Sequence, residues 1–391
     1  MHKLPTSLAI SDSEKVISDF SEGVDDLSIV KDWSNISFSG IATAVQASIT
    51  WGKRSQSKVL FLPKTQRNLD DTIEGLINKP HQFVAAMFAK SIVTQDNNES
   101  LNVRSQVNLA AKSNIEKQQS NNYGQQRGGL CWFAFVDHSR MGFDKNFYLE
   151  STLKKPTPRD QSQLQSVIFS MISKSTSISG GSKEPNEKTK KLVGRLFYEL
   201  FINTHQHGSR GVNRDEWLKP AVRLIYTQGI NLTIDGVNGT LKDDPALQGY
   251  IGCDFDKARY IEISIVDSGL GYYKRWISDR PSEYIQSPSV DDEYKIFKRC
   301  FSFRQGSTGR DEKGNGLPVV MQRLTELGGF MRIRSGRLSL FRDFVKSPYN
   351  NDESCGFYDW TSLEEAENKL TAMAPVEGVS ITLLIPLEGK R

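Results

Sequence analysis

Apolar and polar positions in the first half of the chain alternate in blocks that predict helices and strands in turn. Residues 41–49 have helical apolar spacing, and residues 58–63 form a short apolar run typical of a buried strand. Residues 69–91 show helical periods again, interrupted at Pro80, and residues 130–136 predict another strand. This order predicts an α/β domain at the N-terminus.

Less regular stretches separate this part from the second half. Residues 94–129 are rich in Asn, Gln and Ser, which predicts a long surface excursion or a disordered loop. A short strand is expected at 147–149, a helix at 164–172, and a Ser- and Gly-rich linker at 173–181. The expected domains are therefore residues 1–159 and residues 160–391.

The next helix carries polar groups where its apolar face should be. It is expected to start at Pro185 and to end at Gly208, which are suitable first-turn and C-cap residues. At about 100° per residue, Glu199 falls at the edge of its apolar stripe, and Asn203 and His207 fall inside it. Burying such groups costs several kcal/mol unless partners compensate. The helix therefore contributes either to a buried hydrogen-bond network or to a site for a polar ligand.

An acidic residue ends the next predicted strand, at residues 260–267. Ile261, Ile263 and Ile265 alternate onto one face, and Asp267 keeps their phase. Gly269 and Gly271 follow and would let the backbone approach a flat ligand closely. A hairpin with an Asp turn explains the segment equally well when it is taken alone.

A glycine-containing loop then leads into a helix with apolar positions at Leu317, Val320, Met321, Leu324 and Leu327. Free N–H groups at such a helix start, with glycines before them, form a site suited to phosphates. Strands are expected after this helix at 328–335 and at 378–386. The residues at the loop end are Lys313, Gly314, Asn315, Gly316 and Leu317.

Composition narrows the class of protein without identifying it. The formal net charge is +4 and spread along the chain, which does not argue for nucleic-acid binding. The four cysteines are far apart and form no Cys-x-x-Cys pair, so a zinc site or a disulfide framework is not expected. No apolar run approaches the ~18 residues of a membrane span, and the first residues lack a signal core. We expect a cytoplasmic protein without a membrane partner.

Taken together and in this order, these segments resemble the ATPase superfamily of gyrase B subunits, large heat-shock chaperones, histidine kinases and mismatch-repair proteins (GHKL, Bergerat fold). The resemblance covers residues 185–387, about half of the chain. It implies an α/β (α+β) sandwich in which ATP lies between helices and a mixed, mainly antiparallel sheet. The N-terminal α/β domain could have the shape of a sulfate-transporter/anti-sigma-antagonist (STAS) domain, an interpretation based on periodicity alone.

The resemblance also implies roles for individual residues. Asn203 looks like the Mg²⁺ ligand that ties the metal to the phosphates of ATP, and Asp267 like the acceptor for the adenine amino group. Gly269 and Gly271 would shape the pocket around the base. Residues 272–313 would be the lid, with Lys313 able to steady phosphate charge. The backbone donors to the phosphates would be Gly314, Asn315, Gly316 and Leu317, and His207 matches a position near the phosphates.

Two features depart from the family pattern. The closing strand usually has Thr directly after the glycine that corresponds to Gly378, where its hydroxyl contacts adenine; here the residue is Val379. Ser380 and Thr382 fall on the opposite strand face and cannot simply replace it. A long insert at about 236–257 has no counterpart. Direct recognition of the base by this strand is therefore in doubt, or recognition is mediated by water.

The residue type at position 199 distinguishes branches of the superfamily. Glu199 lies one helical turn before Asn203, where hydrolytic members carry the acid that activates water and histidine kinases usually carry an amide. A surface glutamate is the alternative interpretation. His2, His81 and His138 lack the context of a phospho-accepting histidine, which disfavours a histidine kinase.

Three functions remain open from the sequence. The first is a Mg²⁺-dependent ATPase that switches contacts with a protein partner or with a second copy of the chain. The second is a serine/threonine protein kinase of the anti-sigma type, because Glu199 and the pair His207–Gly208 resemble that branch. The third is a module that binds ATP without hydrolysing it.

Overall fold

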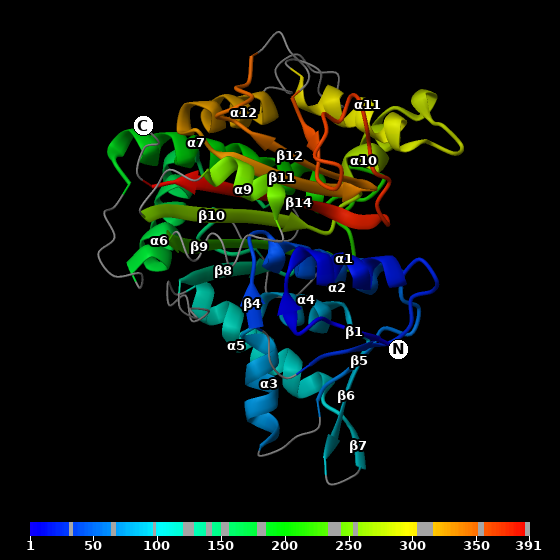
Figure 1. Cartoon of the computed structure of the whole chain (residues 1–391). Helices are drawn as coiled ribbons and strands as arrows, with labels where there is room; N and C mark the ends of the chain where they lie inside the picture. The colour runs from blue at the N-terminus through cyan, green and yellow to red at the C-terminus, as the bar shows by residue number, and fades with distance from the viewer. Residues whose placement is uncertain are drawn as a thin grey trace.

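The computed structural model describes residues 1–30, 34–63, 68–96, 99–119, 129–137, 143–149, 156–177, 185–233, 244–252, 257–302, 316–350 and 356–387. Helices and strands alternate through these residues and build two larger sheets (Figure 1). The prediction of a mixed α/β fold is confirmed.

The first sheet belongs to the N-terminal part and has the strand order β1-β3-β5-β6-β7. Its first four strands are parallel, and β7 is added antiparallel at the edge. A separate parallel pair is formed by β2 (Ser7–Leu8) and β4 (Ser34–Ile36). The strands of the first sheet are β1 (His2–Lys3), β3 (Leu27–Ser28), β5 (Val59–Phe61), β6 (Ser91–Asp96) and β7 (Glu99–Asn102).

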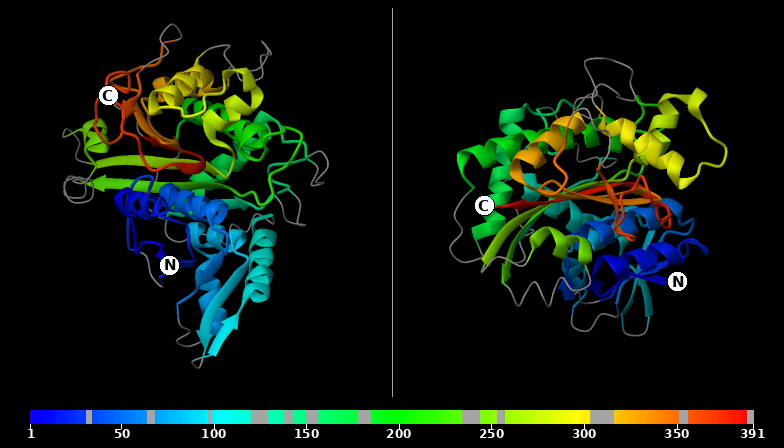
Figure 2. Two further views of the ribbon diagram at one scale, coloured as in Figure 1. Left: turned by 90° about the vertical axis from the view of Figure 1, so that its right-hand side faces the viewer. Right: turned by 45° about the horizontal axis from the view of Figure 1, so that its top comes forward.

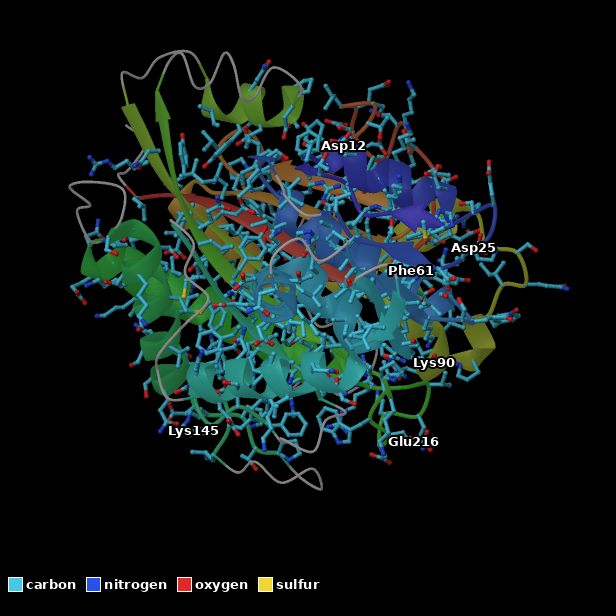
Figure 3. All side chains as sticks on the ribbon, turned by 90° about the horizontal axis from the view of Figure 1, so that it is seen from below. Asp12, Asp25, Phe61, Lys90, Lys145 and Glu216 are labelled. Carbon is cyan, nitrogen blue, oxygen red and sulfur yellow. The ribbon has the colours of Figure 1, made fainter. Side chains whose placement is uncertain are left out.

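Helices connect these strands as the apolar spacing predicts. The helix expected at 41–49 is the centre of α2, and Pro80 begins α4 instead of interrupting a helix. Figure 3 shows the molecule from below, the side on which this N-terminal part lies in Figure 1. The helices of this part are α1 (Ile10–Asp19), α2 (Gly40–Arg54), α3 (Leu69–Ile77), α4 (Pro80–Phe88) and α5 (Arg104–Gln119).

The prediction of a loop over residues 94–129 is wrong for most of its length. These residues complete β6, form β7 and then form the helix α5. Val103, Val107, Ala111 and Ile115 are buried at intervals of four residues, so a narrow apolar stripe holds the segment to the core. The polar residues between them hid this stripe in the sequence.

The second sheet has the strand order β13-β12-β11-β14-β10-β9-β8, and all its described pairings are antiparallel. The mixed pairing implied by the resemblance is thus not found among the described strands. Its strands are β8 (Leu130–Phe135), β9 (Arg223–Thr233), β10 (Lys257–Asp267), β11 (Phe330–Gly336), β12 (Leu338–Asp343), β13 (Tyr358–Asp359) and β14 (Val376–Pro386).

The sheets divide the chain earlier than the boundary expected at residue 160. Strand β8 pairs with β9 and therefore belongs to the second sheet. The strand expected at 147–149 is only an isolated bridge between Tyr148 and Pro158. Because β8 and β9 are separated by two helices in the chain, their pairing could not be read from the local pattern.

Most of the helices that follow β8 cover one face of the second sheet, whereas the helix at 245–251 packs on the opposite face, against Tyr260 and Phe330. The helix α7 begins after its cap Asn186, whose side chain accepts from Thr189 N, so Pro185 precedes the helix. The helix α6 continues to Ser177 through part of the expected linker. The described helices and helical turns after β8 are α6 (Gln161–Ser177), α7 (Glu187–Asn203), the π-helical turn η1 (Thr204–Gly208), α9 (Pro245–Ile251), α10 (Gly271–Asp279), the 3₁₀ turn η2 (Pro281–Glu283), α11 (Val290–Phe301) and α12 (Gly316–Leu327).

The N-terminal part packs against the opposite face of the same sheet. Figure 2 shows this part on one side of the sheet and α7, α10, α11 and α12 on the other. Side chains alternate accordingly, since Ile265 contributes to the core under the later helices and Val266 to the core shared with α2. We call the face that contacts α7 and α12 the front face, and the face that contacts α2 the back face.

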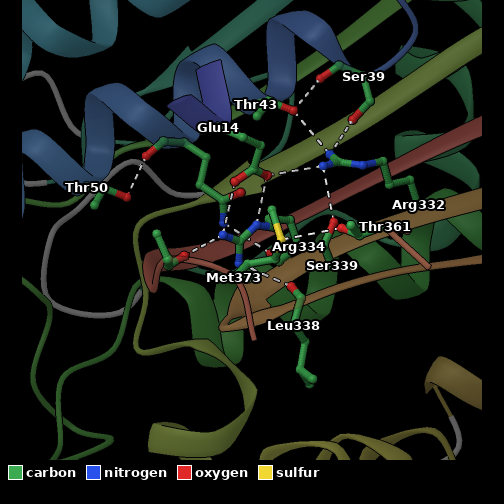
Figure 4. A network of polar contacts seen from close by, with 12 residues as sticks. Glu14, Ser39, Thr43, Thr50, Arg332, Arg334, Leu338, Ser339, Thr361 and Met373 are labelled. Carbon is green, nitrogen blue, oxygen red and sulfur yellow. Dashed lines mark hydrogen bonds and ion pairs between the residues drawn. The ribbon is translucent and has the colours of Figure 1, made fainter. Parts of the chain in front are cut away.

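Buried polar groups tie the N-terminal part to the back face (Figure 4). Glu14 forms a two-pronged ion pair with Arg334, with N–O distances of 2.9 and 3.1 Å, and accepts from Arg332 at 3.3 Å. Arg332 Nη1 also donates to the hydroxyls of Ser39 and Thr43, at 3.1 Å each. Both arginines are 1% exposed or less. None of the helices described here is long and apolar enough to cross a membrane.

Candidate functional site

A cavity of about 140 Å³ lies on the front face, between the sheet and the surrounding helices. Strands β10 and β14 form its floor, α7 and η1 one wall, and α10, α11 and the start of α12 the others. The described residues that line it are Leu200, Asn203, Thr204, Gln206, His207, Gly208, Ile265, Asp267, Gly271, Tyr272, Arg275, Trp276, Cys300, Gly316, Leu317, Val379 and Ile381.

Six of the residues predicted from the sequence line this cavity: Asn203, His207, Asp267, Gly271, Gly316 and Leu317. They come from four separate elements and from a turn, across more than a hundred residues of chain. Glu199 and Gly269 are not among the lining residues but contact residues that are. Lys313, Gly314 and Asn315 lie outside the described residues.

Helix α7 packs against α12, and this contact places Glu199 and Asn203 beside the start of α12. A Cβ atom added to Gly316 would lie 3.0 Å from Glu199 Oε2 and 3.6 Å from both side-chain polar atoms of Asn203. Asn203 Nδ2 is buried and has no hydrogen-bond partner among the described residues. An unpaired buried donor is costly, so this atom indicates a ligand or water in the cavity.

Glu199 forms an ion pair with Arg195, one turn earlier on α7, at 2.5 Å. Arg195 Nη1 in turn donates to Gln161 Oε1 on α6 at 2.5 Å. Burial raises the pKa of the Glu199 carboxyl, while the charge of Arg195 acts in the opposite direction. The sequence contains a signal for this pair, since Arg195 and Glu199 have the i,i+4 spacing of helix ion pairs.

Asp267 lines the cavity at the end of β10, directly against the turn η1. Its Oδ1 accepts from Gly269 N at 2.8 Å, and burial raises the pKa of its carboxyl to about 6. The carboxyl packs directly on the turn η1, because a Cβ added to Gly208 would lie 2.5 Å from Asp267 Cγ. A Cβ at Gly269 would likewise lie 2.7 Å from Gly208 Cα. The two glycines let the backbone approach this carboxyl.

Gly271 adopts a left-handed conformation, with φ +78°, at the start of α10. A Cβ there would lie 3.0 Å from Ser335 Oγ, which also accepts from Tyr272 N at 3.2 Å. Glycine is therefore required on two counts, by its backbone angle and by the close approach of β11.

The floor of the cavity is apolar around Asp267. Ile265, Val379 and Ile381 line it. Ser380 and Thr382 do lie on the back face, as predicted: Thr382 Oγ1 shares a hydrogen bond with Ser39 Oγ at 3.0 Å, across the contact with the N-terminal part. No hydroxyl from β14 thus reaches the cavity.

The wall opposite η1 includes the described part of the expected lid, residues 272–302. Tyr272 of α10 packs against Phe297 and Phe301 of α11, with ring centroids 5.4 and 5.7 Å apart. Arg275, Trp276 and Cys300 line the cavity from these helices and were not singled out in the sequence. Residues 303–313 of the expected lid lie outside the described residues.

The end of α7 differs from the α-helix expected to continue to Gly208. Residues Thr204–Gly208 form a π-helical turn, and Thr204, Gln206, His207 and Gly208 all line the cavity. Such turns are rare in proteins, and those that occur are often found at functional sites. Helical periodicity in a sequence does not distinguish them, so this feature had no usable signal.

Within the described residues, no group of three or more His, Cys, Asp and Glu side chains could hold a metal ion by itself. No protein-family model, no curated protein and no solved structure matches this chain. The cavity and its residues are therefore the basis for assigning a function.

Proposed function

We propose that the protein binds ATP in this cavity and hydrolyses it in a Mg²⁺-dependent reaction, as a conformational switch. We further propose that residues 185–387 form a Bergerat-type sandwich. The observation that carries the proposal is the meeting of Asn203, Asp267 and Gly316 around one cavity, with Glu199 directly behind Gly316. The resemblance implies a role in nucleotide binding or hydrolysis for each of these four residues.

The adenine base would lie on the apolar floor against Asp267. The carboxyl is 6% exposed, and an ionised carboxylate is an acceptor for the amino group of adenine. Val379 offers only methyl groups at the position where the family has a hydroxyl. The remaining base contacts would come from water or from the wall formed by Tyr272 and Trp276.

The phosphates would lie between Asn203 and the start of α12. The buried, unpaired Nδ2 of Asn203 and the glycine at residue 316 fit a polar ligand at this place. The side-chain oxygen of Asn203 would hold Mg²⁺, which supplies neutralisation of phosphate charge when bound. Leu317 continues the helix start and lines the same cavity.

Glu199 would accept a proton from the attacking water. Its side chain is 14% exposed, and its ion pair with Arg195 fixes the direction of the carboxylate. Burial raises the pKa of this group, which makes it a better proton acceptor at neutral pH, and Arg195 limits that rise. ATP hydrolysis would change the conformation of α10 and α11, and with it their contacts with a protein partner or a second copy of the chain.

Phosphorylation of the protein's own N-terminal half is less well supported. Ser39, Thr43 and Thr50 lie at the back face, whereas the cavity is on the front face. All three side chains are buried and hydrogen-bonded. Within one chain they cannot reach the cavity without undocking.

The test compares the wild type with Glu199→Gln, using Glu187→Gln at the exposed start of the same helix as a matched control. We expect phosphate release to fall by about 10²–10⁴-fold in Glu199→Gln and to remain unchanged in the control. Binding of a non-hydrolysable ATP analogue, measured by calorimetry, should stay within a few-fold of the wild type. No binding by the wild type in the presence of Mg²⁺ would refute the proposal; binding without phosphate release would indicate a binding module, and labelling of a protein by ATP would indicate a kinase.

A further inference from the structure

A buried polar cluster lies behind the wall of the cavity formed by η1. At its centre is Arg223, the first residue of β9, which is 1% exposed. Its Nε and Nη2 atoms donate to the two carboxylate oxygens of Asp137, at 2.8 Å each. Nη2 also donates to Tyr148 Oη at 2.8 Å. Asp137 and Tyr148 come from the segment after β8, so the cluster joins this segment to β9.

The same cluster holds the turn η1 at three points. Tyr148 Oη shares a hydrogen bond with His205 Nδ1 at 3.2 Å. Ser209 Oγ, directly after the turn, donates to Asp137 Oδ2 at 2.8 Å. Arg223 Nη1 donates to Thr204 Oγ1 at 3.4 Å. The side chains attached to the cluster thus span the turn from its first residue to the residue after its last.

Arg223 also lies beside Asp267. The two residues are direct partners in the antiparallel pairing of β9 and β10. Burial raises the pKa of Asp267, and the nearby charge of Arg223 opposes this rise. The other groups that face Asp267 are Lys53 from α2, Tyr272 from α10 and His207 from η1, which lines the same cavity.

We infer that Arg223 is a positioning residue for the ligand cavity, which fixes the turn η1 against the wall formed by Asp267. It does not line the cavity. It acts through Asp137 and Tyr148, which hold the turn, and through its charge, which favours the ionised form of Asp267. This inference rests on the proposed function, because it concerns the same nucleotide site.

A geometric reason makes such support necessary. Asp267 Cγ and the backbone of Gly208 are so close that no side chain fits at residue 208. A small displacement of the turn therefore changes the shape of the cavity at the carboxyl that is proposed to bind the base. The π-helical turn leaves a gap in the regular helix ladder, and the cluster supplies hydrogen bonds from outside the helix.

The test uses the full chain with Tyr148→Phe, which removes one oxygen atom and with it the bonds to Arg223 and His205. The control is Tyr260→Phe, a buried tyrosine on the back face of β10. We expect Tyr148→Phe to bind a non-hydrolysable ATP analogue with Mg²⁺ about tenfold more weakly, and Tyr260→Phe to bind as the wild type does. Hydrogen exchange at residues 204–209 should be faster in Tyr148→Phe alone.

A second variant, Arg223→Gln, tests the electrostatic part through the pH dependence of binding. In the wild type, affinity should fall as the pH drops through about 6, where Asp267 becomes protonated. Without the charge of Arg223 the fall should begin at a higher pH, a change that loss of packing alone would not produce. If Arg223→Gln does not fold, the positioning role is tested by ligand binding and hydrogen exchange in Tyr148→Phe.

The outcomes separate the two proposals. Wild-type affinity in Tyr148→Phe, with binding intact in the wild type, would overturn the positioning role and leave the proposed function standing. Equal weakening in Tyr148→Phe and Tyr260→Phe would also overturn it. Failure of the wild type to bind the analogue would overturn the proposed function and this inference together.

Discussion

Glu262 is a buried carboxyl on the back face of β10, and its environment is unusual for an ionised group. Tyr226 Oη and Ser39 N both donate to Oε1, the latter at 3.1 Å, whereas Oε2 has no partner among the described residues. Burial raises the pKa of this carboxyl to about 7, although both hydrogen bonds act in the opposite direction. The neutral acid is thus favoured up to neutral pH.

This pKa predicts how stability depends on pH. The folded protein binds the proton of Glu262 more tightly than the unfolded chain, whose glutamate titrates near 4.5. The stabilisation is complete below about 4.5 and is lost as the pH rises through about 7. We expect Glu262→Gln to remove this loss and to be more stable than the wild type at pH 8, by on the order of 3 kcal/mol.

Urea unfolding at pH 5 and pH 8 measures this effect. The advantage of Glu262→Gln should shrink or vanish at pH 5, where the wild-type carboxyl is neutral. Glu74→Gln, on the exposed side of α3, is the control and should show no such difference. An equal change at both pH values would contradict the assignment of the pKa to Glu262.

At the residue scale, the sequence was informative where a polar residue broke an apolar pattern. Asn203 and Asp267 were found in this way, and both line the cavity. Arg223 and Asp137 were not found, because each is the terminal or flanking residue of a strand and pairs with a residue distant in the chain. A local pattern cannot reveal such a pair.

At the element scale, the turn η1 predicts the effect of one added methyl group. Gly208→Ala would place Cβ within 2.5 Å of Asp267 Cγ, so the turn or the carboxyl must move. We expect at least tenfold weaker binding of the ATP analogue and a loss of stability of about 1–3 kcal/mol.

Gly75→Ala in α3 is the matched control for this substitution. An added Cβ meets nothing within 4 Å there, and alanine favours a helix over glycine by roughly 1 kcal/mol. The control should bind the analogue normally and be at least as stable as the wild type. Calorimetry and thermal unfolding distinguish the two variants; normal binding by Gly208→Ala would exclude a tight fit between η1 and Asp267.

The elements differ in how well the sequence predicted them. Strands β10 and β14 and helices α7 and α12 were expected within a few residues, because strong apolar spacing marks each. The helix α5 was missed since its apolar stripe is a single residue wide. The π-helical form of η1 was missed because helical periodicity does not distinguish it, and its contacts with Asp137 and Tyr148 join residues that are distant in the chain.

At the scale of the whole molecule, the packing of the N-terminal part on the back face had no signal in the sequence. The helix α2 is apolar on most sides, since it is buried between the first sheet and the second. The alternation of β10, with Glu262 and Ser264 on one face, indicated a polar face that could equally have met solvent. Only the structure shows that Ser39 and Thr382 meet there.

The ion pair of Glu14 with Arg332 and Arg334 predicts how strongly this packing depends on charge. Burial opposes the ionisation of Glu14, but the two arginines outweigh it and lower the pKa of the carboxyl. Its stabilisation is therefore present above about 4.5 and lost as the pH falls through the lower folded value. Glu14→Gln would remove the counter-charge that the two buried guanidinium groups share, and we expect a loss of about 3–5 kcal/mol at pH 7.

Asp19→Asn, at the exposed end of the same helix α1, is the matched control and should change stability by less than about 0.5 kcal/mol. Urea unfolding followed by far-UV circular dichroism and by tryptophan fluorescence gives both stabilities. Trp51 on α2 and Trp132 on β8, two of the six tryptophans, both lie in the core where the N-terminal part meets the second sheet, so fluorescence reports on this contact and circular dichroism on the secondary structure of the whole chain. Because the pair lies between those parts, the two signals should separate in Glu14→Gln and coincide in the wild type. A stability of Glu14→Gln equal to that of Asp19→Asn would show that the buried charges do not hold the N-terminal part in place.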